Sequence, residues 1–162
     1  MEYQYEYFAS QALGLPKNAW RAFATLPAQR YARGSELYTQ GEKAAALYYI
    51  VSGRVRTYTS SAEGGEKILT VYKSGDILGE AAFFDGMPRV SSARLLTDGC
   101  IAAIDKPTLL RCMEENSALA FSLLKYLSGT VRMLSVQLNT LTFLPADKRV
   151  ARLLLNMRSG RG

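Results

Sequence analysis

Residues 75–93 read GDILGEAAFFDGMPRVSSA, and the interpretation of the whole chain starts from this stretch. Glycines stand at 75, 79 and 86, a spacing typical of tight turns between short elements. Residues 76–78 and 91–95 have the composition of short strands on either side of the turns. The stretch therefore predicts a short strand, a turn that begins at Gly79, and a second short strand.

The same pattern extends over residues 28–106, where runs rich in β-branched and aromatic residues alternate with glycines. Many short strands at this interval predict a mainly β fold of the sandwich or jelly-roll kind. A tight turn is expected at Ser52 and Gly53, and a polar hairpin loop at 62–66. The predicted strands are residues 47–51, 54–59, 67–72, 76–78, 91–95 and 100–104.

Helical patterns follow the β-rich region. Pro107 suits the first turn of a helix that reaches about Glu115, and Asn116 or Ser117 is expected to cap a much longer helix. Apolar residues in the long helix recur at spacings of four and three, which is typical of a heptad seam. The seam fits either a parallel pair of chains or packing within one chain. Its members are Ala120, Leu124, Leu127, Val131, Leu134, Leu138 and Leu141, of which the last six are the predicted dimer interface.

The ends of the chain have other patterns. Residues 17–26 form an amphipathic stretch with Trp20 and Phe23 on one face, which predicts a short helix outside the main body. Pro145 opens a further helix over 146–157, and residues 158–162 have the composition of a linker. We therefore divide the chain into an N-terminal helical segment (1–27), a β-roll (28–106), helices with the dimerisation helix (107–144), and a final helix and linker (145–162).

Composition excludes several classes of function. The chain has 162 residues, a net charge of +6 and no histidine, so His-dependent triads and His-rich metal sites are ruled out. Its two cysteines are too few for a disulfide framework. No apolar run approaches the roughly 20 residues of a membrane span, and no secretory signal is visible at the start. We expect a cytoplasmic protein that is not an enzyme, with no catalytic residue, no metal, no cofactor and no membrane partner.

The stretch 75–93 also contains groups that suit a sugar-phosphate ligand. A guanidinium such as that of Arg89 pairs with a phosphate through two hydrogen bonds, and backbone N–H groups after Gly79 can meet other phosphate oxygens. Glu80 offers an acceptor for a ribose hydroxyl, and Pro88 fixes the backbone just before the arginine. The alternative interpretation is that Glu80 and Arg89 simply form an ion pair across a loop.

The pattern around this pair resembles the cyclic-nucleotide-binding domain family. The family's phosphate-binding segment has Gly-Glu-x-Ala, a short apolar turn, and then Pro-Arg-x-x-Ser/Thr. The glycine framework upstream and the motif at 149–156 are similar to the Crp–Fnr branch of bacterial transcription regulators. The matching positions of the segment are Gly79, Glu80, Ala82, Gly86, Pro88, Arg89 and Ser92.

The resemblance implies a double-stranded β-helix (jelly roll) followed by a long dimerisation helix. It implies that Arg89 holds a cyclic phosphate and Glu80 the ribose hydroxyl of a ligand such as cyclic AMP or cyclic GMP. Gly79, Ala82 and the region of Val90, Ser91 and Ser92 would complete the pocket.

The base-reading end departs from the family pattern. Leu134 stands where cyclic-AMP-responsive members have a threonine, and Thr130 where they have an arginine, while Ser135 matches a serine that reaches the partner's ligand. The identity of the nucleobase therefore stays open. Two alternatives also stay open: the pocket binds a different anionic ligand, or the chain is a dimerisation domain that works without ligand. The resemblance implies a homodimer, and DNA binding only through a winged helix-turn-helix module that does not follow Asn156 in this sequence.

Overall fold

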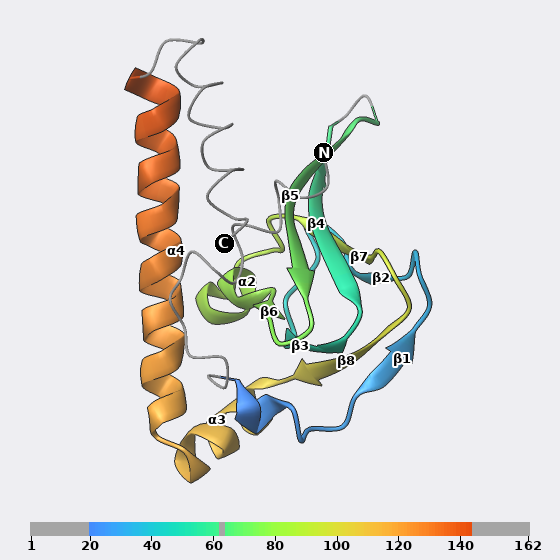
Figure 1. Cartoon of the computed structure of the whole chain (residues 1–162), viewed down its shortest axis with the longest axis vertical. Helices are drawn as coiled ribbons and strands as arrows, with labels where there is room; N and C mark the ends of the chain where they lie inside the picture. Colours follow the sequence, from blue (N-terminus) through green and yellow to red (C-terminus); the bar gives the residue numbers. More distant parts are fainter. Residues whose placement is uncertain (1–19, 62–63, 144–162) are drawn as a thin grey trace, which may run out of the picture.

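The structure, a computed structural model, describes residues 20–61 and 64–143, with side chains up to residue 135. Within these residues, eight antiparallel strands form two four-stranded sheets, with a helical layer along one side (Figure 1). The first sheet has the order β1 (Gln29–Tyr31), β8 (Gly99–Ile104), β3 (Leu47–Ser52) and β6 (Ile77–Leu78). The second has the order β2 (Glu36–Tyr38), β7 (Ser92–Leu95), β4 (Arg54–Ser60) and β5 (Glu66–Lys73). The predicted mainly β fold with flanking helices is confirmed.

Two apolar clusters hold these layers together. The first fills the interior of the roll, because inward-facing side chains from both sheets meet there. Its buried members are Tyr38, Ile50, Val55, Leu78, Ala93, Leu95 and Ile101. The second packs the outer face of the first sheet against the helices. Its members include Phe23, Leu47, Tyr49, Ile104, Leu109, Leu119, Leu123 and Tyr126.

The predicted tight turn at Gly53 is present, and it connects the two sheets. Strand β3 pairs with β6 and β8, whereas β4 pairs with β5 and β7, so the two strands beside the turn do not pair with each other. Gly53 has φ of +94°, and a Cβ there would lie 2.9 Å from the Asp98 carbonyl oxygen and from Gly99 Cα. Only glycine fits this crossing, because its backbone is left-handed and in contact with another strand.

The other predicted strands are confirmed with small shifts at their ends. The hairpin of β4 and β5 pairs Ser60 with Glu66 around the predicted loop, of which residues 62 and 63 lie outside the described part. Strand β6 begins at Ile77 instead of 76, since Asp76 turns its carboxylate back to accept a hydrogen bond from the Lys73 N–H at 2.9 Å.

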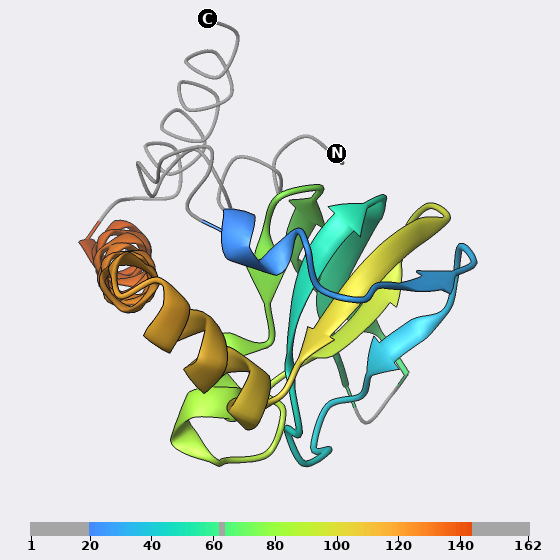
Figure 2. The same cartoon turned by 90° about the horizontal axis from the view of Figure 1, so that it is seen from below.

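The helices follow the predicted order. Helix α3 (Lys106–Glu115) has Pro107 in its first turn, and the Asp105 carboxylate caps it by accepting from the Thr108 N–H at 2.9 Å. Helix α4 (Ala118–Phe143) runs along one side of the roll, and the short α2 (Glu80–Asp85) projects on the same side (Figures 1 and 2). Within the described residues, no helix combines the length and the apolar character that crossing a membrane requires.

Residues 20–26 of the N-terminal segment pack outside the roll, as predicted, against the outer face of the first sheet and α4. The described helix of this segment is a 3-10 turn, η1 (Arg21–Phe23), which is shorter than the predicted 17–26. Phe23 is fully buried and Trp20 nearly so, because both rings meet apolar side chains from the first sheet and α4. An apolar face on a short helix indicates burial, but it does not show against what.

Helix α4 has two different apolar rows. Leu119, Leu123 and Tyr126 are buried against the roll, and Leu127 also packs there in part, so this member of the predicted seam contacts its own chain. Phe121, Leu124, Val131 and Leu134 are exposed. The side chains of Leu138 and Leu141, the predicted helix 146–157 and the final linker lie outside the described residues. The predicted domain boundaries stay predictions.

Candidate functional site

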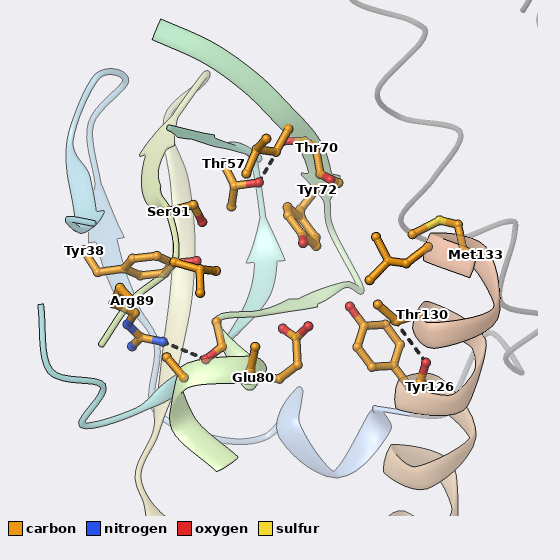
Figure 3. A pocket seen from close by; sticks show the side chains of 16 residues that line it. Tyr38, Thr57, Thr70, Tyr72, Glu80, Arg89, Ser91, Tyr126, Thr130 and Met133 are labelled. Atoms are coloured by element: carbon orange, nitrogen blue, oxygen red, sulfur yellow. Dashed lines mark hydrogen bonds between the residues drawn. The ribbon is translucent and has the colours of Figure 1, made fainter. Parts of the chain in front are cut away.

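A cavity of about 310 Å³ lies between the second sheet, helix α2 and helix α4. Figure 3 shows its lining side chains: Arg89, Tyr38 and Ser91 on one side, Tyr72 and Thr70 above, and Tyr126, Thr130 and Met133 on α4. This volume is at the lower end of the range for small-molecule pockets. The lining residues are Tyr38, Thr57, Leu69, Thr70, Tyr72, Gly79, Glu80, Ala81, Ala82, Arg89, Val90, Ser91, Tyr126, Thr130, Met133 and Leu134.

Arg89 is fixed in place by the fold. Its backbone N–H donates to the Glu42 carbonyl and its carbonyl accepts from the Gly41 N–H, each at 2.8 Å. The guanidinium donates from Nη1 to the Gly79 carbonyl at 2.6 Å and from Nη2 to the Ala46 carbonyl at 2.5 Å. It also stacks over the Tyr38 ring at 4.2 Å. This arginine is therefore preorganised, with its orientation set by backbone acceptors and by an aromatic face.

The Nε atom of the Arg89 guanidinium has no hydrogen-bond partner among the described residues. The side chain is 4% exposed, and its Nε–H makes no hydrogen bond within the described residues. An unpaired buried donor costs roughly 1–3 kcal/mol. Since Arg89 lines the cavity, an anion entering there can bring both the missing acceptor and the opposite charge.

Gly79 allows the short helix to begin directly beside this guanidinium. It has φ of +80°, and a Cβ on it would lie 2.7 Å from Arg89 Nη1. Residues with a side chain rarely adopt this backbone conformation. The first turn of α2 and the arginine therefore come together only because position 79 has no side chain.

Glu80 points from the first turn of α2 into the cavity (Figure 3). Burial raises the pKa of its carboxyl above the usual value, while its own backbone N–H and the positive charge of Arg89 lower that pKa in part. The described residues contain no ion pair between Glu80 and Arg89; the ion pairs found there join Arg56 and Arg94 to Glu36 or Glu66. The interpretation of Glu80 and Arg89 as a simple ion pair is therefore wrong for this structure.

The structure places three of the other predicted residues of this segment around the cavity and one outside it. Ala82 and Ser91 are buried and line the cavity, and Val90 lines it while remaining largely exposed. Ser92 does not line it, because its hydroxyl oxygen accepts a hydrogen bond from the Gln40 N–H at 2.9 Å.

The far end of the cavity is formed by α4 and by the hairpin of β4 and β5. Leu134, predicted at the base-reading end, lines it. Ser135 is exposed outside this cavity and donates from its hydroxyl to the Val131 carbonyl at 2.9 Å. Among the described residues, no group of three His, Cys, Asp or Glu side chains is arranged to hold a metal.

Much of the cavity lining was not predicted from the sequence, although some of these residues have the spacing of one helix face or one strand face. Tyr126, Thr130, Met133 and Leu134 follow the spacing of one helical face, and Thr70 and Tyr72 alternate along one face of β5. Among the described residues, the lining residues that were not predicted as ligand contacts are Tyr38, Thr57, Leu69, Thr70, Tyr72, Ala81, Tyr126, Thr130 and Met133.

The fold and the cavity together define a β-roll domain of the ligand-binding class. The family model of the cyclic nucleotide-binding domain matches residues 28–116, which is more than half of the chain. The chain belongs to the cyclic nucleotide-binding domain family, in its Crp–Fnr branch. The predicted family and jelly-roll fold are confirmed.

The similar proteins are regulators of transcription. The chain is 31% identical over 127 residues to the CRP-like cAMP-activated global transcriptional regulator of Mycobacterium tuberculosis, covering 78% of this chain and 57% of that protein. It is 33% identical over 129 residues to the cAMP-activated global transcriptional regulator CRP of Salmonella typhimurium, covering 79% and 61%. The crystal structure of Thermus thermophilus catabolite activator protein matches with a TM-score of 0.69 at 26% identity, covering 82% of this chain and 64% of that one. The chain thus spans about three-fifths of the length of these relatives.

Proposed function

We propose that this chain senses a cyclic nucleotide for a bacterial transcription regulator and that the ligand binds in the cavity beside α2. Arg89 holds the cyclic phosphate, Glu80 accepts from the ribose 2′-hydroxyl, and the base extends toward β5 and α4. The observation that supports this most strongly is that the buried Arg89 guanidinium has an unpaired donor beside an open cavity.

Charge complementarity supports a single phosphodiester. Arg89 is the one cation among the cavity-lining residues that the structure describes, and Glu80 is the one carboxylate. Because a cyclic mononucleotide has one negative charge and one free ribose hydroxyl, the two groups match it one to one. Backbone N–H groups in the first turn of α2 add donors for the phosphate oxygens.

The cavity wall suggests how binding is communicated. Helix α4 supplies Tyr126, Thr130, Met133 and Leu134 to the wall, whereas the charged groups come from the segment around α2. A ligand that touches both parts favours one arrangement of α4 against the roll, because it can shift only an equilibrium whose two states it contacts differently.

The exposed row on α4 supports dimerisation with a second copy. Phe121 is 73% exposed, Leu124 61% and Val131 63%, and apolar side chains at such spacings are typical of a two-helix seam. Leu134 belongs both to this row and to the cavity wall. We therefore infer that ligand binding and the packing of two α4 helices affect each other through Leu134.

The relatives suggest how the signal is used. As they are regulators of transcription that extend beyond the region matched here, we propose a cytoplasmic role in which the roll controls DNA binding by a part of the regulator outside this region. No catalytic role, metal or cofactor is assigned to the chain in this proposal.

A different anionic ligand is the second candidate. The end of the cavity near Leu134 also has Met133 and Leu69, so much of it is apolar. An apolar end suits a hydrophobic acid as well as a nucleobase. Leu134 stands where the resemblance places a base-contacting threonine in cyclic-AMP-responsive members.

Thermal unfolding with a panel of ligands tests the proposal. Ligand that binds only the folded chain raises the melting temperature with concentration. We expect a dose-dependent rise with cyclic AMP or cyclic GMP and none with cyclic di-GMP or with the open-chain 5′-monophosphates. A melting temperature unmoved by every cyclic mononucleotide would leave the second candidate as the better account.

A further inference from the structure

Among its described residues, helix α4 presents one free hydrogen-bond donor to the cavity, the hydroxyl of Tyr126. Four of the described α4 side chains line the cavity, and of these only Tyr126 and Thr130 have hydroxyl groups. The Thr130 hydroxyl already donates to the Tyr126 backbone carbonyl at 3.1 Å. Within the described part of the chain, no group is hydrogen-bonded to the Tyr126 hydroxyl.

The Tyr126 ring is fixed by packing against other aromatic side chains. It is 5% exposed and meets the edge of Trp20 at 5.7 Å between ring centroids, with an interplanar angle of 83°. Trp20 stacks in turn on Phe23 at 6.1 Å, and Phe23 meets Tyr49 at 6.2 Å. Because aromatic packing fixes the ring, the direction of the hydroxyl is set before any ligand arrives.

The Tyr126 hydroxyl lies on the side of the cavity where Glu80 projects. Figure 3 shows the hydroxyl end of the ring and the Glu80 carboxyl directed into the same space. Burial raises the pKa of Tyr126 well above its usual value, and the negative charge of Glu80 adds to that rise. A neutral phenol that remains a donor therefore stands near a carboxylate acceptor.

A ribose 2′-hydroxyl fits between these two groups, because it can donate one hydrogen bond and accept another. We propose that Tyr126 is a sugar-contacting residue on α4, donating to the same 2′-oxygen whose proton is directed at Glu80. This inference rests on the proposed function and adds to it a specific contact between ligand and α4. Sugar recognition is then shared between the segment at α2 and the long helix.

The test combines Tyr126→Phe with removal of the ligand's 2′-hydroxyl. Affinities of the wild-type chain and the variant are measured by calorimetry for the cyclic nucleotide that wild type binds more tightly, cyclic AMP or cyclic GMP, and for its 2′-deoxy analogue. We expect Tyr126→Phe to weaken the ribose form by roughly three- to tenfold. We expect the 2′-deoxy form to bind both proteins equally, since neither can then make the contact.

Tyr49→Phe is the matched control. It removes a hydroxyl from the same aromatic cluster, but Tyr49 does not line the cavity, so its affinity for both ligands should equal that of wild type. Phenylalanine keeps the ring that Trp20 packs against, and thermal unfolding of each variant checks that the fold is retained.

The outcomes separate this inference from the proposed function. An equal loss of affinity for the ribose and 2′-deoxy forms in Tyr126→Phe would place the hydroxyl elsewhere on the ligand and overturn the inference alone. The same holds if Tyr126→Phe binds the ribose form as wild type does. If wild type binds neither cyclic nucleotide, the proposed function itself fails, and the sugar contact fails with it.

Discussion

Arg89 is bound by the fold through two of its terminal N–H groups and keeps a third donor unpaired. Burying a guanidinium with an unmet donor is costly. The carbonyls of Gly79 and Ala46 and the face of Tyr38 offset part of that cost. A ligand anion can offset the remainder, so the site is arranged for a negative charge.

Replacing Arg89 by alanine should remove the ligand's charge partner. We expect Arg89→Ala to weaken cyclic-nucleotide binding by about 2–3 kcal/mol, because charge-assisted hydrogen bonds are the stronger class. Calorimetry of the purified variant measures this directly. Arg111→Ala is the control, since Arg111 is exposed on α3 away from the cavity, and equal affinities in the two variants would contradict the role of Arg89.

Glu80 should reduce the stability of the ligand-free chain. Its pKa in the folded state lies above the ordinary value of 4.5, mainly because of burial. The folded chain then binds the proton more tightly than the unfolded chain does, so this group's contribution to stability falls as pH rises above 4.5. It stops changing once the pH exceeds the raised pKa.

The variant Glu80→Gln cannot lose a proton, so it should be more stable than wild type at neutral pH and similar to it in acid. The same change should weaken ligand binding, because the sugar loses a charged acceptor. Denaturant unfolding from about pH 4 to about pH 8 measures the difference. A stability difference that did not grow with pH would contradict a half-buried Glu80 that is ionised at neutral pH.

Sequence reasoning could identify Gly79, Glu80 and Arg89 because they lie within one short stretch with a recognisable spacing. It could not identify Tyr38, which supports Arg89 from another strand. Strand β2 reaches the site by pairing with β7, and such long-range pairing leaves no local pattern. It also could not distinguish Ser91 from Ser92, since a shift of one residue along a strand exchanges the two faces.

At the scale of elements, α2 is delimited by two left-handed glycines. Gly79 precedes the helix with φ of +80°, and Gly86 follows it with φ of +71°. A Cβ at 79 would meet Arg89, whereas a Cβ at 86 would have nothing within 4 Å. A side chain at either position would strain the left-handed backbone. Only a side chain at position 79 would also contact the site.

Gly79→Ala and Gly86→Ala should therefore both destabilise the chain, by about 1–2 kcal/mol from the left-handed backbone. Only Gly79→Ala should also weaken ligand binding, because its methyl group would displace the Arg89 guanidinium. Thermal unfolding and ligand titration of both variants check this. Equal binding by the two variants would show that Gly79 is needed for the turn alone.

The two rows of α4 lead to a prediction about assembly. Leu124 is 61% exposed, and it does not line the cavity, so Leu124→Asp should abolish dimers while the monomer stays folded. Leu110→Asp, at a 49% exposed leucine on α3, is the control that should leave dimers intact. Sedimentation velocity measures the assembly, and dimers that persist in Leu124→Asp would contradict the seam.

The elements themselves were largely predictable, whereas their partners were not. Pro107 correctly marked the start of α3, and Asn116 and Ser117 correctly marked the boundary between α3 and α4, because helix ends depend on local chemistry. The turn at Gly53 was also correct, but the strands on either side belong to different sheets. Whether two neighbouring strands pair depends on packing of the whole roll, which a turn sequence does not encode.

For the whole molecule, the cavity lies where the roll meets the long helix, and both contribute to its wall. The aromatic side chains of Trp20 and Phe23 connect the N-terminal segment to the same helix. A ligand bound there would contact the part of the fold that carries the charged groups and the part that carries the exposed apolar row. This placement supports the proposed role in sensing.

A crystal structure of the chain grown with saturating cyclic AMP or cyclic GMP tests the central claim most directly. The account predicts one ligand in each cavity, with a phosphate oxygen about 3 Å from a nitrogen of the Arg89 guanidinium and the ribose 2′-oxygen within hydrogen-bonding distance of Glu80. A cavity that stayed empty at saturating ligand, or a nucleotide bound with its phosphate away from Arg89, would contradict it.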